Sequence, residues 1–92
     1  MGVNDVEDKR YDLILVVGCN QTQARDLWAM VRHKYPVASR VKYVSRNPCG
    51  LDGLNYQGML IVLVGTYWLN PVMDSTGMKW LMKLGAEVVR EE

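Results

Sequence analysis

Two uninterrupted aliphatic runs dominate the pattern of hydrophobic and polar positions, at residues 13–17 and 59–64, and a glycine closes each of them. Runs of this length, rich in branched residues, are typical of strands that are buried on both faces of a parallel sheet. Two short stretches, residues 41–44 and 86–89, each hold three apolar residues and one charged residue, and they predict two further strands. The chain therefore predicts four strands, of which two lie at the centre of a sheet.

Apolar residues recur at helical spacing in two of the segments between these strands. Asn20 is expected to cap the first helix, with Gln23 completing a capping box, and Pro36 is expected to end it. The second helix is predicted to follow a cap at Asp74 and to end at Gly85. The first helix is expected to bury Ala24, Leu27, Trp28, Val31 and Tyr35. The second is expected to bury Gly77, Trp80, Leu81 and Leu84.

Alternating strands and helices predict a small Rossmann-like three-layer α/β domain, because parallel strands joined by crossover helices pack in this way. The simplest arrangement has four parallel strands in the order 2-1-3-4. The first helix is expected to cover one face, and the second helix together with the turn-rich connection 45–57 the other. Two helices leave part of such a sheet uncovered, so we expect exposed apolar side chains among Trp68, Met73, Met78 and Met82. Residues 1–10 are predicted to form a flexible tail, and residues 11–92 a single domain.

The composition is that of a soluble globular protein, with 49% hydrophobic and 23% charged residues. The longest strand-like run, residues 59–64, is far too short to span a bilayer. The acidic N-terminal segment lacks the apolar stretch of a secretory signal, which predicts a cytoplasmic protein. The two cysteines, Cys19 and Cys49, are expected to be reduced, and with the one histidine they cannot supply four zinc ligands. We therefore expect neither a metal nor a cofactor.

Positive charge gathers in one part of the chain, between residues 13 and 46. This stretch holds six of the eleven Lys and Arg residues and is opposed there only by Asp26. Such clustering is compatible with binding to a phosphate backbone, and equally with a solvated helix face followed by an exposed loop. Nucleic acid is therefore one of the partners that the sequence allows.

In a doubly wound sheet, ligands bind at the carboxyl ends of the strands, next to the point where the strand order reverses. The chain predicts that Asn20, Gln21 and Arg46 lie there, beside the aromatic pair Tyr67 and Trp68. An anion at the first helix N-terminus would meet free amides, and the aromatic pair could stack a base, close the core or contact a partner. However, the stretch 18–22 lacks the glycines of a dinucleotide fingerprint, and no phosphate-loop lysine is present.

Catalytic patterns are missing from the sequence. Cys19 is the strongest nucleophile candidate, because a helix N-terminus lowers a thiol pKa, but no base stands near it in sequence. His33 falls late in a helix, where the helix C-terminus accounts for it. Ser45, Ser75 and Thr76 lack a nucleophile elbow. We therefore expect a protein that is not an enzyme.

Four short segments together give the chain a pattern that can be compared with known families. They are VSR at 44–46, L-x-G-L at 51–54, LIVLVGTYW at 60–68 and LGAEVV at 84–89. In these segments the chain resembles small, uncharacterised α/β proteins encoded by phages of actinobacteria, over residues 11–90. The resemblance implies a phage or prophage accessory role and carries over no functional residue.

Two functions follow from these observations. The first is a noncatalytic interaction protein that contacts a protein partner or a second copy of itself through apolar surface left by the two helices. The second is an anion, nucleotide or nucleic-acid binder at the carboxyl edge, using Asn20, Gln21, Arg46, Tyr67 and Trp68.

Overall fold

The computed structural model describes residues 11–36, 38–51 and 54–91, apart from the side chains of Pro48 and Cys49. Its four strands form one sheet in the order β2-β1-β3-β4, and every neighbouring pair is parallel. They are β1 (Tyr11–Val17), β2 (Ala38–Tyr43), β3 (Met59–Val64) and β4 (Glu87–Glu91). The predicted small α/β fold and its strand order are confirmed, while the tail predicted for residues 1–10 lies outside the described residues.

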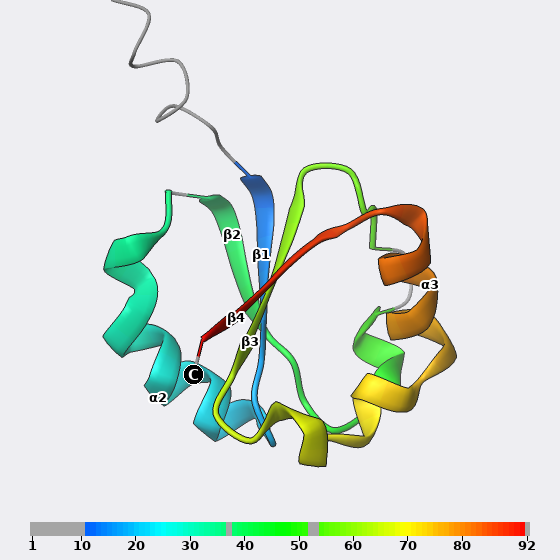
Figure 1. Ribbon diagram of the computed structural model, residues 1–92, viewed down its shortest axis with the longest axis horizontal. Coiled ribbons are helices and arrows are strands. Elements are labelled where there is room, and N and C mark those ends of the chain that lie inside the picture. Colours follow the sequence, from blue (N-terminus) through cyan, green and yellow to red (C-terminus); the bar gives the residue numbers. More distant parts are fainter. Residues whose placement is uncertain (1–10, 37, 52–53, 92) are drawn as a thin grey trace, which may run out of the picture.

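The sheet forms the middle of three layers (Figure 1). Helix α2 (Gln21–Val31) packs on one face, where Ala24 and Trp28 join the even-numbered residues of β1 and β3 in a buried cluster. Helix α3 (Thr76–Leu84) and the 3₁₀ turn η2 (Pro48–Leu51) pack on the other, against the odd-numbered residues. The predicted division of the two faces is confirmed.

The central strands β1 and β3 account for most of the core. All six residues of β3 are buried, and it pairs with β1 in a register that places Leu13 beside Met59. The outer strands β2 and β4 have one neighbour each and are largely exposed or half-buried. They extend beyond their predicted ranges, starting at Ala38 and ending at Glu91, because edge strands carry polar residues that break the apolar pattern.

Side chains and a glycine fix the helix ends. Asn20 caps α2 as predicted, since its Oδ1 accepts a hydrogen bond from the Gln23 backbone N–H at 2.8 Å. The α-helix ends at Val31, however, and the 3₁₀ turn η1 (Arg32–Lys34) lies in the interval before Pro36. The cap of α3 is Ser75 rather than Asp74, because the Ser75 hydroxyl accepts from the Met78 N–H at 3.1 Å. Gly85 ends α3 in a left-handed conformation, as predicted.

The rotation of α3 about its axis differs from the prediction. Met78, expected among the exposed apolar residues, is fully buried, whereas Trp80 and Leu84 are 57% and 38% exposed. Met78 and Leu81 face the sheet, and Trp80, two positions from Met78, therefore points away from it. Trp68 is exposed as predicted, and Met73 and Met82 are half-buried against the core. Among the described residues, no helix has the length and apolar character needed to cross a membrane.

Candidate functional site: the carboxyl edge and the Trp68 groove

The structure brings the predicted site residues to the carboxyl edge of the sheet, but their side chains bond to the protein itself. Arg46 follows β2 and donates from Nη1 to the carbonyls of Cys19 at 3.1 Å and Leu69 at 3.4 Å. Gln21, in the first turn of α2, donates from Nε2 to the Tyr43 carbonyl at 3.1 Å. Together with the Asn20 cap, these contacts join the ends of β1 and β2 to the loops beside them.

Asn70 is the buried polar residue of this edge, and its side chain is 1% exposed. Its Nδ2 donates to the Gly18 carbonyl at 2.9 Å and to the Ser45 carbonyl at 3.3 Å. Its Oδ1 accepts from the Val72 N–H at 2.9 Å and caps the 3₁₀ turn η4 (Pro71–Asp74). One amide therefore connects the segments that follow β1, β2 and β3.

Gln23 makes a second connection of this kind. The capping box predicts a contact from its side chain to the Asn20 N–H, but the structure directs Oε1 to the Cys19 N–H, at 2.8 Å. The same oxygen accepts from the Thr66 N–H at 3.1 Å and from the Thr66 hydroxyl at 3.3 Å. Sequence reasoning identified Gln23 as a capping residue and missed this long-range role, because spacing along a helix reports only local contacts.

These contacts change what the carboxyl edge can do chemically. A phosphate or carboxylate that recruited Arg46 would compete with the hydrogen bonds that Arg46 makes to two carbonyls. A ligand that recruited Gln21 would compete with the Tyr43 carbonyl in the same way. The arrangement therefore favours a structural role for this edge.

The aromatic pair after β3 divides between two environments. Tyr67 packs against the core cluster on the α3 face, whereas Trp68 is 63% exposed. Their rings meet edge to face, with centroids 5.3 Å apart and an interplanar angle of 82°. This geometry does not offer two parallel faces between which a base could stack.

Trp68 instead forms one wall of a groove beside α2, which we call the Trp68 groove. Its volume is about 660 Å³. It is lined by Leu27, Met30, Val31, Lys34, Val64, Gly65, Trp68 and Glu91. Met30, on the helix wall, is 68% exposed, so two of the largest exposed apolar side chains of the described residues border one groove.

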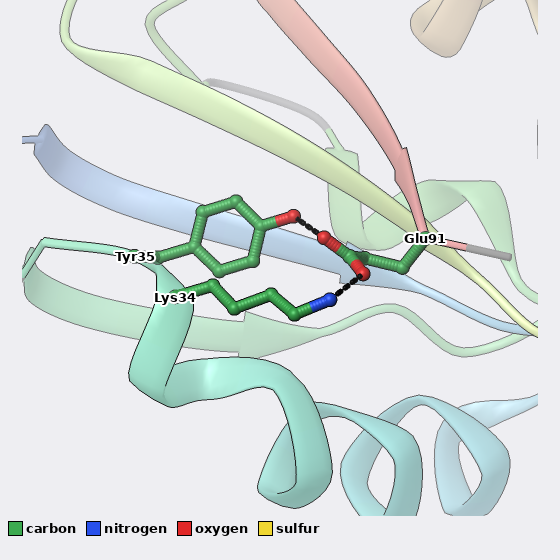
Figure 2. A network of polar contacts seen from close by, with 3 residues as sticks. All are labelled: Lys34, Tyr35 and Glu91. Atoms are coloured by element: carbon green, nitrogen blue, oxygen red, sulfur yellow. Dashed lines mark hydrogen bonds and ion pairs between the residues drawn. The ribbon is translucent and has the colours of Figure 1, made fainter.

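A polar cluster lies at the β4 end of the groove, where the chain turns from η1 (Figure 2). The Glu91 carboxylate accepts hydrogen bonds from the Tyr35 hydroxyl and from Lys34 Nζ, the latter at 3.1 Å. The Tyr35 hydrogen bond, followed by that from Lys34, lowers the pKa of Glu91 below its ordinary value. Burial, followed by the contact with Glu91, raises the pKa of the Tyr35 hydroxyl. The two charges in the groove lining therefore neutralise each other.

Metal ligands and the two cysteines were the remaining candidates for chemistry in the sequence. The described residues contain no group of three or more His, Cys, Asp or Glu side chains placed to hold a metal ion. The Cys19 thiol is free and half-buried, and the hydrogen bonds found at Cys19 involve its backbone. Cys49, the other predicted free thiol, has its side chain outside the described set.

Comparison with known proteins found no match among family models, curated proteins or solved structures.

Proposed function

We propose that this chain is a noncatalytic interaction protein that acts by protein–protein contact through the Trp68 groove. The observation that carries the proposal is the exposure of Met30 and Trp68, which both line a largely apolar groove. Burial of apolar surface contributes about 25 cal/mol per Å², so a partner that covers both side chains gains binding free energy. The resemblance to phage-encoded proteins adds to the proposal the role of an accessory factor.

A second copy of the chain is the partner that suits this surface best. Asp26, Met30 and Lys34 are spaced four residues apart along α2 and η1, so they form one ridge beside the groove. When two such ridges pack antiparallel about a two-fold axis at Met30, Asp26 of each copy faces Lys34 of the other. Lys34 already pairs with Glu91, but its side chain is 54% exposed and its ammonium group has further N–H donors, so it can also bind Asp26. This added contact supports a symmetric dimer in which Met30 and Trp68 lose their contact with water.

Sedimentation equilibrium over a range of concentrations tests the proposal. We expect a reversible monomer–dimer equilibrium, weakened at least about a hundredfold by Met30→Glu, since two buried Met side chains are lost. Asp26→Lys is expected to weaken it about tenfold, because two attractive charge contacts become repulsive. Asp74→Lys is the matched control, because it makes the same charge change at an exposed residue outside the groove and should leave the equilibrium unchanged.

Photocrosslinking in cells distinguishes the interaction function from the identity of the partner. A photoreactive residue is placed at position 30 in one variant and at position 79, as a control, in another. Adducts of twice the chain mass from position 30 support the dimer. Adducts with another protein, formed at position 30 and not at position 79, retain the interaction function and overturn the second copy as partner. No adduct specific to position 30 overturns both.

A further inference from the structure

A second concave surface lies on the other flank of α2, between this helix and the edge strand β2. Its volume is about 510 Å³. It is lined by Ile14, Trp28, Arg32, His33, Tyr35, Pro36, Ala38, Val41 and Tyr43. We call it the α2–β2 cleft, and it shares no lining residue with the Trp68 groove.

The helix wall of the cleft is basic. Arg32 lines the cleft, and Arg25 lies two turns earlier on the same flank of α2, about 10 Å away along the helix axis. Both side chains are exposed, and neither forms a hydrogen bond or an ion pair with another described residue. His33 adds a third nitrogen-bearing side chain, and no carboxylate lines the cleft. One unneutralised guanidinium group, that of Arg32, therefore borders the cleft, and a second, that of Arg25, lies two helical turns away.

The floor of the cleft is aromatic and apolar. The parallel register pairs Val41 with Ile14 and Tyr43 with Val16, which places both β2 side chains on the face that α2 covers. Tyr35 stacks on Trp28 with ring centroids 5.4 Å apart, so the floor is backed by a packed aromatic pair. The hydrogen bond from Gln21 to the Tyr43 carbonyl ties the helix to the strand at one end.

The geometry points to a binding site for a nucleotide unit, with the base on the aromatic floor and the phosphate on Arg32 or Arg25. Cleft volumes of this size accommodate small ligands, and a basic wall beside aromatic rings is the arrangement by which proteins hold single-stranded nucleic acid. The chemistry is the same for a free nucleotide and for a unit within a strand. This inference is independent of the proposed dimer, which uses the opposite flank of α2.

Fluorescence anisotropy with a labelled oligothymidylate of about 12 nucleotides tests the site. We expect binding at low salt, with a logarithmic salt slope of about −1 to −2, the value for two phosphate contacts on a single strand. Arg32→Glu and Arg25→Glu are each expected to weaken binding about tenfold, and Val41→Glu, at the cleft floor, by a similar factor. Lys79→Glu on α3 is the matched control with the same net charge and should bind as the wild type does.

Competition with unlabelled ligand identifies the source of the nucleotide unit. Displacement of the oligonucleotide by thymidine monophosphate assigns the cleft to free nucleotides, and displacement by unlabelled strand alone assigns it to nucleic acid. Absence of binding at low salt overturns the inference, and so does an equal loss in Lys79→Glu, because net charge would then explain the binding. The dimer equilibrium of Arg32→Glu, measured in parallel, is expected to stay unchanged.

Discussion

Gln23 and Asn70 show how single polar side chains hold together an edge that the sheet itself leaves open. Parallel strands end with backbone groups that have no partner in the sheet, and the loops after β1 and β3 run close to each other there. Each side-chain amide forms hydrogen bonds with two or three of these backbone groups. It therefore takes the place of water where other side chains cover the end of the sheet. The free energy of unfolding should therefore be unusually sensitive to both.

Replacement of Gln23 by alanine tests this sensitivity. The change leaves the Cys19 and Thr66 N–H groups without their acceptor, which is expected to lower the free energy of unfolding by about 2 kcal/mol. Gln23→Glu keeps an acceptor oxygen and is expected to retain most of that stability. Urea denaturation measures both, and an equal loss in the two variants would assign the effect to packing instead.

The cluster of Lys34, Tyr35 and Glu91 makes stability depend on pH. Because the pKa of Glu91 is lowered in the folded state, its contribution is present above the ordinary value of 4.5 and is lost as the pH falls through the folded pKa. Glu91→Gln is expected to be less stable than the wild type at neutral pH, by no more than about 1 kcal/mol for an ion pair open to solvent. The two proteins should converge in acid, as thermal unfolding from neutral to acidic pH would show.

Tyr35→Phe provides the second arm of the same experiment. It removes the hydroxyl and keeps the ring that stacks on Trp28, so it should weaken the acid dependence without loss of the aromatic contact. The same change should also remove the loss of stability that the wild type shows at alkaline pH. The raised pKa of Tyr35 means that its contribution is complete below the ordinary value of 10.0 and is lost at higher pH. If both variants lost stability in acid to the same extent as the wild type, a role for this cluster would be contradicted.

At the scale of elements, α3 shows the limit of a hydrophobic pattern. Met78, Trp80, Leu81 and Leu84 are all apolar, so the sequence admits more than one rotation of the helix about its axis. The cap at Ser75 and the packing of Met78 and Leu81 against the sheet select one rotation, which turns Trp80 to solvent. The existence of the helix and its end at Gly85 were predictable, because both depend on local signals.

Two alanine substitutions in α3 test this rotation. Met78→Ala is expected to lower the free energy of unfolding by about 3 kcal/mol, since it empties a fully buried site. Trp80→Ala removes a larger side chain but is expected to cost less than about 1 kcal/mol, because that side chain is mostly in water. Guanidinium denaturation of both variants checks the order, and a larger loss for Trp80→Ala would contradict the observed rotation.

At the scale of the whole molecule, the two buried strands were predictable from two apolar runs, because a strand buried on both faces needs an unbroken apolar sequence. Their order was predicted only as the simplest arrangement of four parallel strands, and the structure confirms it. The hydrogen-bond partners of the candidate site residues could not be predicted in the same way. The sequence placed Arg46 and Gln21 at the right edge of the sheet, but the carbonyls they bond belong to segments far away in the chain. The Trp68 groove and the α2–β2 cleft both arise because one helix covers each face of a four-stranded sheet, which leaves hollows on both flanks of α2.

The wholly parallel pairing of β1 with β3 has a consequence for synthesis on the ribosome. The two strands can pair only after residues 59–64 have emerged, whereas β2, the other neighbour of β1, emerges earlier. Until then, one edge of the aliphatic segment of β1 lacks its partner, and such segments readily join other chains. Slow non-local pairing prolongs this interval. The nascent chain is therefore most vulnerable to aggregation while β3 is still inside the exit tunnel.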